Sequence, residues 1–248
     1  MPNELTSFIR ETFRKQNIEN AVIALSGGID SAVSLTLLTI ALTPENITPI
    51  LLPYGDQDMT DARVICNFNH FNEKKCLTID IKPIVDQICH IQQIETTDQL
   101  RRGNIMARVR MILVFDTARK KNALVCGTEN KTEHFLGYFT RFGDAASDIE
   151  PIAHLYKTQV RSLAGTLRLP QHLIDKTPSA GLWDMQTDEK ELGFSYAQAD
   201  QVLEQLIDHH VAPENISLPN VSPEVITKII ARVDANAFKL HVPYTFSK

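Results

Sequence analysis

The sequence lacks the features that mark membrane, secreted and nucleic-acid-binding proteins. Its apolar runs fall short of the ~20 residues that a helix needs to span a bilayer, and no cationic leader precedes the first amphipathic pattern. The formal net charge is −5, which argues against nonspecific nucleic-acid binding as the main task. We therefore expect a cytoplasmic chain with neither a membrane span nor a nucleic-acid partner.

Cysteine and histidine are too sparse and too scattered to indicate a metal centre or a covalent catalyst. The four cysteines, Cys66, Cys76, Cys89 and Cys126, show no paired spacing, so they indicate neither a zinc site nor a disulfide framework. We expect reduced, mostly buried thiols. The eight histidines show no spacing that would hold a metal, and no Ser/His/Asp or Cys/His set supports nucleophilic catalysis.

Short β-branched runs alternate with helical patterns along the 248 residues. Strands are expected at residues 21–25, 47–52, 75–81 and 123–126. Helices are expected at residues 1–17, 32–42, 58–71, 83–94, 99–120, 196–209 and 223–236. This alternation predicts an α/β fold with a doubly wound, mostly parallel sheet and helices on both faces, as a single domain over residues 1–248. Ligands of such sheets bind beyond the carboxyl ends of the strands.

A glycine-containing run, Ser26-Gly27-Gly28-Ile29-Asp30-Ser31, follows the first expected strand and precedes a helical pattern. That order places backbone N–H groups where they can bind an anion, and the glycines let phosphate oxygens approach the backbone. Asp30 would repel a polyphosphate unless it binds a bridging Mg²⁺. Because no lysine follows the glycines, a kinase or GTPase is disfavoured. An ordinary turn between strand and helix is the alternative.

A second run of this kind, Gly127 to Glu133, follows the last expected strand. Glu133 would lie about one helical turn beyond the strand and could complete a Mg²⁺ site with Asp30, phosphate oxygens supplying the remaining ligands. The alternative is a capped helix start, formed by residues of the same run: Thr128, Asn130 or Thr132 as the cap, with Glu129 or Glu133 in the first turn.

Aromatic and charged residues alternate further along the chain, in the run Gly137 to Asp144. Flat rings beside charges suit a heteroaromatic ligand that carries phosphates, although Lys157 and Arg161 could equally form a solvated helix face. Four arginines, Arg101, Arg102, Arg108 and Arg110, suit small anionic ligands. The stretch from residue 175 to 193, with Trp183, is expected to be a loop that orders over ligand.

These segments together resemble a known family. The SGGIDS run resembles the loop of the ATP pyrophosphatases. Five later segments resemble the NAD⁺ synthetase family and occur in the same order as in that family. They are GNIMARVRM (103–111), GTENKTE (127–133), GYFTRFGD (137–144), KTQV (157–160) and PSAGLW-x-x-QTDE (178–189), so that the resemblance covers nearly the whole chain. Since the chain begins shortly before the SGGIDS run, it resembles the short, ammonia-dependent form. The resemblance implies an adenine nucleotide alpha hydrolase-like fold.

The resemblance implies a ligase that makes NAD⁺ in two steps. The nicotinate carboxylate of deamido-NAD⁺ attacks the α-phosphate of ATP and forms an acyl-adenylate, with release of pyrophosphate. Ammonia then attacks the activated carbonyl and releases AMP. The family forms homodimers with deamido-NAD⁺ at the interface, and the expected helix at 99–120 suits either a dimer contact or the core.

Site residues follow from the same resemblance, position by position. Those implied for ATP are Ala24, Leu25, Ser26, Gly27, Gly28, Ile29, Asp30, Ser31, Thr128, Lys157 and Ser179. Asp30 and Glu133 match the Mg²⁺ ligands. Lys157 would counter phosphate charge, and Asp144 would hold ammonium or accept a proton.

Five further positions match residues that bind deamido-NAD⁺ in the family, namely Arg108, Arg141, Asp148, Phe238 and Lys239. Three positions depart from the family pattern. Arg141 stands where relatives often have lysine, Ser179 where they often have threonine, and Phe238 where many have histidine. Two other functions remain open: adenylation of a different acid by the same loop, and a noncatalytic ATP sensor.

Overall fold

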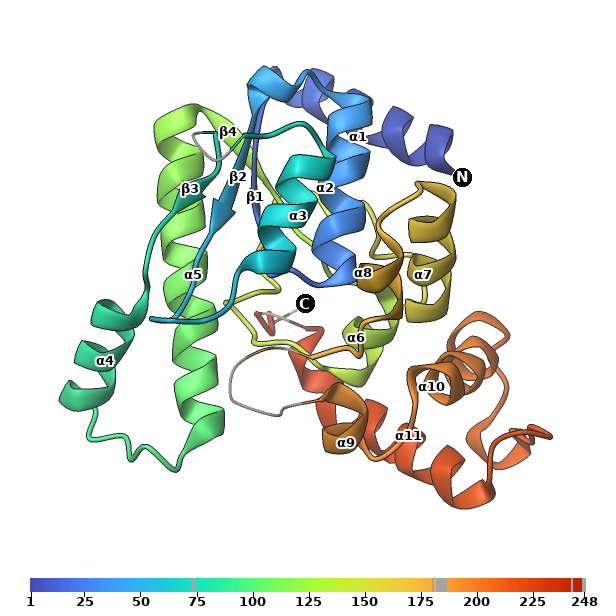
Figure 1. The fold of residues 1–248 in the computed structure, drawn as a ribbon. Helices are drawn as coiled ribbons and strands as arrows, with labels where there is room; N and C mark the ends of the chain where they lie inside the picture. The colour runs from blue at the N-terminus through green and yellow to red at the C-terminus, as the bar shows by residue number, and fades with distance from the viewer. Residues whose placement is uncertain (73–74, 180, 182–186, 242, 247–248) are drawn as a thin grey trace.

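The centre of the molecule is a parallel four-stranded sheet, with strand order β3-β2-β1-β4 (Figure 1). The computed structural model describes residues 1–72, 75–179, 181, 187–241 and 243–246. The strands are β1 (Asn20–Ala24), β2 (Ile47–Leu51), β3 (Leu77–Thr78) and β4 (Ala123–Cys126). The predicted α/β fold is therefore confirmed.

Helices connect these strands and cover both faces of the sheet. In the described residues they are α1 (Pro2–Gln16), α2 (Ile29–Ala41), α3 (Thr60–Phe68), α4 (Lys82–Ile91), α5 (Gln99–Lys121), α6 (Lys131–Leu136), α7 (Lys157–Thr166), α8 (Gln171–Asp175), α9 (Asp188–Leu192), α10 (Tyr196–Leu203) and α11 (Pro223–Asn236). Short 3₁₀ or π turns lie at Pro44–Asn46, Glu204–Asp208, Pro213–Asn215 and Ala237–Lys239. None of the helices in the described part is long and apolar enough to cross a membrane.

Alternation along the strands divides the core into two layers. Ala21 and Ile23 of β1 pack with α1, α2, α3 and α7, whereas Val22 packs on the other face with α4 and α5. Figure 1 shows α5 on one side of the sheet and α2 and α3 on the other. Because successive strand residues point to opposite faces, both faces of a central strand are apolar. α5 buries Met106 and Val109 in its layer and exposes Ile112.

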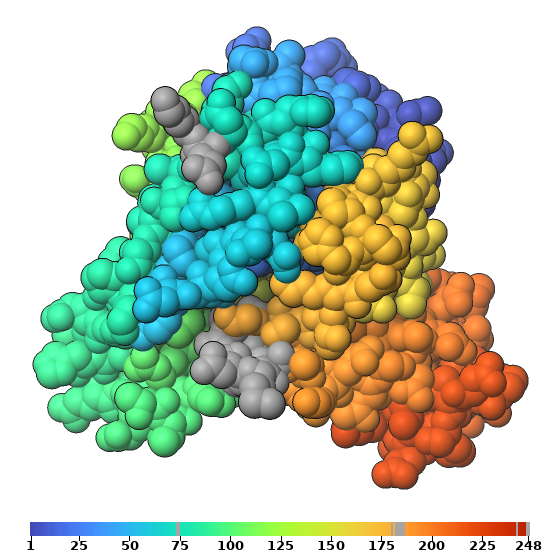
Figure 2. Space-filling view, viewed as in Figure 1, coloured from blue at the N-terminus to red at the C-terminus, as the bar shows by residue number. Residues whose placement is uncertain are grey.

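The C-terminal helices and α6 together build a separate helical layer. α6, α9, α10 and α11 enclose a third apolar cluster around Leu136, Tyr196 and Ile229. Figure 2 shows the C-terminal segment, in orange, packed directly beside the yellow segment that contains α7 and α8. The layer places the C-terminal residues opposite the carboxyl end of the sheet.

Two predicted elements differ from the structure. The strand expected at residues 75–81 has only Leu77 and Thr78 in β3, at the sheet edge, although Ile79 and Ile81 still donate backbone hydrogen bonds to the β2 side. The expected loop at 175–193 contains α9, which ends at Gly193 in a left-handed conformation. Residues 180 and 182–186, with Trp183 among them, lie outside the described residues. The prediction that the 175–193 stretch orders over ligand stays a prediction.

Candidate active site at the carboxyl end of the sheet

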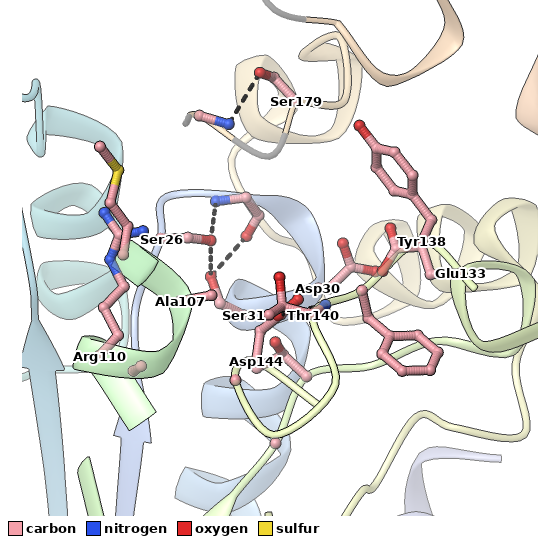
Figure 3. A pocket seen from close by; sticks show the side chains of 18 of the residues that line it. Ser26, Asp30, Ser31, Ala107, Arg110, Glu133, Tyr138, Thr140, Asp144 and Ser179 are labelled. Atoms are coloured by element: carbon pink, nitrogen blue, oxygen red, sulfur yellow. Dashed lines mark hydrogen bonds between the residues drawn. The ribbon is translucent and has the colours of Figure 1, made fainter. Parts of the chain in front are cut away.

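An open cleft of about 1210 Å³ lies beyond the carboxyl ends of β1 and β4. Figure 3 shows how distant segments meet there: Ser26 and Ser31 from the glycine turn, Arg110 from α5, Glu133 from α6 and Asp144 from the loop that follows. This is the edge at which parallel α/β sheets bind ligands.

The glycine turn joins β1 to the N-terminus of α2. Gly28 is the N-cap of α2, and no side chain caps the helix, so the first N–H groups of α2 have no side-chain partner there. Ser31 Oγ donates to Gly28 O at 2.9 Å, and Gly28 N donates to Ser26 Oγ at 3.2 Å. Gly27 has φ 81°, and a Cβ there would lie 3.1 Å from Asp61 Cβ. The turn is thus a rigid cradle for an anion.

The ammonium group of Lys157 lies between two carboxylates. Its Nζ donates to Asp30 Oδ2 at 2.6 Å and to Glu133 Oε1 at 2.7 Å. Asn130 Nδ2 donates to the other Asp30 oxygen at 2.9 Å, and Tyr196 OH donates to Glu133 at 3.3 Å. Three distant segments are joined in this charged cluster, in which Lys157 is 3% exposed.

Burial and neighbouring charge oppose one another in this cluster. Burial raises the pKa of Glu133 to about 7, against the lowering effect of Lys157. Burial by itself would lower the pKa of Lys157, but the two carboxylates outweigh it and raise that pKa. The lysine therefore stays charged.

Asp30 and Glu133 fit a hard divalent cation. One carboxylate oxygen of each residue contacts the same atom, Lys157 Nζ. The side chain of Asn130 orients Asp30 by donating to its other oxygen. Within the described residues, however, three or more metal-binding side chains do not come together. In nucleotide sites, Mg²⁺ is held by one or two carboxylates, and phosphate oxygens and water fill its remaining coordination positions.

The capped helix start that was the alternative for the Gly127–Glu133 run is confirmed, and the role of Glu133 as a Mg²⁺ ligand stays a prediction. Asn130 is the N-cap of α6, and its Oδ1 accepts from Glu133 N at 3.0 Å. The side chain of Glu133 meanwhile reaches Lys157 in the cleft. The cap fixes the first turn of α6 and thereby directs the Glu133 carboxylate toward Lys157. Gly127 is required because a Cβ there would lie 1.7 Å from Glu150 Oε1.

Glu150 lies directly behind Gly127. Its oxygens accept from Ser147 Oγ at 2.7 Å and Glu129 N at 3.0 Å. Burial nevertheless raises the pKa of Glu150 to about 8.

A side chamber of about 40 Å³ opens beside the charged cluster. It is lined by Thr128, Glu129, Glu133, Tyr138, Phe139, Asp144 and Ala145. Asp144 accepts from Thr140 N at 2.8 Å, and burial raises the pKa of Asp144 against the lowering effect of that bond. One oxygen of Glu129 is buried with no hydrogen-bond partner in the described structure. The chamber can hold one small cation or polar molecule.

Three cationic groups, Arg108, Arg141 and Lys239, line another part of the cleft, which we call the arginine wall. Arg108 Nη2 donates to Arg141 O at 3.3 Å. The Arg141 guanidinium lies 5.5 Å from the ring centre of Phe142 and 5.4 Å from that of Phe238, within cation–π range. Lys239 Nζ donates to Phe139 O at 3.1 Å. These groups form a wall suited to phosphates beside a flat ring.

The structure gathers nearly all predicted site residues around this one cleft. The predicted ATP-binding residues line it except for Gly27, which faces α3 within the turn. The predicted deamido-NAD⁺ residues also line it, except for Asp148. Asp148 instead accepts from Val125 N at 2.7 Å at the β4 edge. Its role stays a prediction.

Two arginines in the cleft were missed as individual site residues. Arg110 donates to Leu52 O at 3.0 Å and to Gln57 at 3.0 Å, and burial lowers its pKa to about 10. Arg232 of α11 lines the same cavity and donates to Leu136 O at 3.1 Å. The arginine cluster near Arg110 was the available signal, whereas nothing local in sequence marks Arg232.

Comparison with known proteins agrees with this geometry. The family model for NAD synthase matches residues 1–243. The chain belongs to the NAD synthase family. An NH₃-dependent NAD⁺ synthetase of Fusobacterium nucleatum is 41% identical over 244 residues, which cover 97% of this chain and 93% of that protein. One of Thermococcus sibiricus is 42% identical, with 86% and 83% covered. These relatives are ligases, and the chain is an enzyme of the same type.

Solved structures of the NAD synthase family share this fold. An NMN synthetase of Francisella tularensis superimposes with a TM-score of 0.85 at 31% identity and covers 100% of this chain and 97% of that one. An NH₃-dependent NAD synthetase of Campylobacter jejuni, in complex with nitrate, gives a TM-score of 0.82 at 32% identity, with 99% and 97% covered.

Proposed function

We propose that the protein uses ATP and ammonia to convert deamido-NAD⁺ to NAD⁺, releasing AMP and pyrophosphate. The observation that carries this is the convergence, in one cleft, of a glycine turn at a helix N-terminus, the Asp30–Lys157–Glu133 cluster and the side chamber with Asp144. The turn and the charged cluster suit ATP with its Mg²⁺, and the side chamber suits ammonia.

The first step joins two anions, and this chain supplies the positive charge. The N–H groups at the start of α2 and the hydroxyls of Ser26 and Ser31 bind the ATP phosphates, and Lys157 stabilises the charge that develops as pyrophosphate leaves. Mg²⁺ bound by Asp30 and Glu133 would neutralise further phosphate charge. The nicotinate carboxylate then attacks the α-phosphorus, forming the acyl-adenylate.

The arginine wall holds the second substrate. Arg108 and Arg141 bind its phosphates, and Lys239 anchors the C-terminal turn of the chain against the Gly137–Phe139 backbone. Holding both nucleotides in one cleft aligns the carboxylate with the α-phosphorus and keeps water from the mixed anhydride.

Ammonia enters the second step from the side chamber. Asp144, Glu129 and the faces of Tyr138 and Phe139 stabilise an ammonium ion there. Asp144 accepts its proton, so that neutral ammonia attacks the activated carbonyl and AMP leaves. The homodimer expected for this family would use exposed apolar residues such as Leu100 and Ile112 of α5.

Product formation tests this proposal directly. NAD⁺ and AMP are measured with ATP, Mg²⁺ and deamido-NAD⁺, with either ammonium or glutamine as nitrogen donor. We expect equal amounts of both products with ammonium and none with glutamine. No AMP with deamido-NAD⁺ but AMP formation with another carboxylic acid would indicate a different acid substrate, and no ATP cleavage with any acid tested would favour a sensor.

Amidation of the mononucleotide is a second candidate. The structurally similar protein of Francisella tularensis is an NMN synthetase, so nicotinate mononucleotide is assayed beside deamido-NAD⁺. A cleft of about 1210 Å³ has room for ATP beside a second nucleotide of either size. The relatives from Fusobacterium nucleatum and Thermococcus sibiricus are NAD⁺ synthetases, which favours the dinucleotide. A kcat/KM higher for the mononucleotide would reverse this assignment.

A further inference from the structure

Two cysteines that are far from paired spacing in the sequence meet in the fold. Cys66 lies in the last turn of α3, and Cys76 immediately precedes the edge strand β3. The Sγ of Cys76 donates to the Sγ of Cys66 at 2.7 Å. A disulfide bond is about 2.05 Å long, so roughly 0.7 Å separates this contact from a covalent bond.

The two thiols differ in access to solvent. Cys66 is 3% exposed and belongs to the apolar core between α2 and α3, whereas Cys76 is only partly buried at the margin of that core. The hydrogen bond from Cys76, together with burial, raises the pKa of the Cys66 thiol. The reaction with an external disulfide therefore begins at Cys76, whose thiolate is the more accessible nucleophile.

We propose that Cys66 and Cys76 form a dithiol site that small-molecule disulfides such as oxidised glutathione convert to an intramolecular disulfide. The Cys76 thiolate first attacks one glutathione sulfur, forming a mixed disulfide and releasing one glutathione thiolate. Cys66 then loses its proton, attacks the Cys76 sulfur and releases the second glutathione. Two cysteine thiols are oxidised, and one glutathione disulfide is reduced to two glutathione molecules.

The bond would join the end of α3 to the edge strand β3. β3 has two residues and pairs with β2 on one side. The pair lies away from the cleft, because the part of α3 that contacts the glycine turn is its first turn, at Asp61 and Ala62. Five residues along a helix separate Asp61 from Cys66 by about 7.5 Å. Closing the bond should therefore stabilise the fold and leave the cleft unchanged.

The test exposes the full-length protein to oxidised glutathione, blocks remaining thiols with an alkylating reagent and maps the peptides by mass spectrometry without reduction. We expect a cross-linked peptide pair containing Cys66 and Cys76, with the buried Cys89 and Cys126 alkylated only after unfolding. The oxidised protein should unfold at a Tm roughly 5–10 °C higher, as expected for a short closed loop.

Two serine variants determine the order of the steps. Cys66→Ser should accumulate glutathione on Cys76, because no second thiol can displace it. Cys76→Ser should remain unmodified, because Cys66 is buried. Circular dichroism of each variant verifies its fold. The proposal would be overturned if, in the oxidised wild-type protein, both Cys66 and Cys76 were still alkylated, or if Cys76 retained the mixed disulfide. Glutathione on Cys66 in the folded Cys76→Ser variant would also overturn it.

Discussion

Replacing Lys157 with methionine tests the buried charge cluster most sharply. Lys157 Nζ lies 2.6 Å from Asp30 and 2.7 Å from Glu133, and its side chain is 4% exposed. At an effective dielectric constant of ~20, each pair contributes about 6 kcal/mol of Coulomb attraction, most of it offset by desolvation. Methionine keeps the apolar stem but leaves two buried carboxylates without their cation.

The free energy of unfolding should fall by about 3–5 kcal/mol, the range measured when one partner of a buried ion pair is removed. For a chain of this length, the Tm should fall by roughly 6–20 °C. Thermal unfolding followed by circular dichroism measures both the transition and its cooperativity. Lys75→Met is the matched control, because the Lys75–Glu45 pair is exposed and its loss should cost under about 1 kcal/mol.

Magnesium distinguishes the proposed metal ligands from a merely structural ion pair. In Lys157→Met, Mg²⁺ without nucleotide should restore part of the lost Tm, because a divalent cation can take the place of the ammonium between the carboxylates. The double variant Asp30→Asn/Lys157→Met should lose this response. A Lys157→Met protein as stable as wild type would refute the charge argument, and an equal Mg²⁺ shift in the double variant would refute the ligand assignment.

Three other predictions address the side chamber, the buried acid and the arginine wall. Asp144→Asn should slow NAD⁺ formation more than pyrophosphate release, as measured by rapid quench, and equal slowing of both would contradict an ammonia role. Glu150 has a folded-state pKa raised to about 8. The folded protein therefore keeps a proton that the unfolded chain loses, and the free energy of unfolding falls as pH rises from about 4.5 to about 8. Urea unfolding at about pH 5 and about pH 8.5 measures this decline in the free energy of unfolding, which Glu150→Gln should reduce by roughly 2–4 kcal/mol. An equal decline in the variant and the wild type would contradict the raised pKa of Glu150. Phe238→Ala should raise the KM for deamido-NAD⁺ about 2–5-fold by freeing Arg141, with Phe238→Tyr near wild type; a matching rise in the KM for ATP would indicate general disruption.

The sequence predicted what depends on local pattern. The Ser26–Ser31 turn has its own signature, since glycines must stand between a strand and a helix N-terminus, and its place in the fold is confirmed. β4 and α11 have the predicted bounds, because apolar periodicity and Ser222 as N-cap define them locally. Asp30 and Glu133 come close together because each follows one of two neighbouring strands, β1 and β4, whereas their role as Mg²⁺ ligands stays a prediction.

What escaped prediction depends on contacts between distant segments. Nothing in sequence shows that Lys157 lies between Asp30 and Glu133, because this requires α7 to pack on α2. The contact of Cys66 with Cys76 depends on α3 ending beside the sheet edge. β3 is short because it lies at the sheet edge, where a strand forms backbone hydrogen bonds with a neighbour on one side alone.

Transfer of oxygen from the acid to AMP tests the central claim most directly. Deamido-NAD⁺ labelled with ¹⁸O in its nicotinate carboxylate is incubated with ATP, Mg²⁺, ammonium and the protein, and the products are analysed by mass spectrometry. Attack of the carboxylate on the α-phosphorus predicts one ¹⁸O in AMP and none in pyrophosphate. Unlabelled AMP formed alongside NAD⁺ would contradict an acyl-adenylate and the mechanism assigned to this cleft.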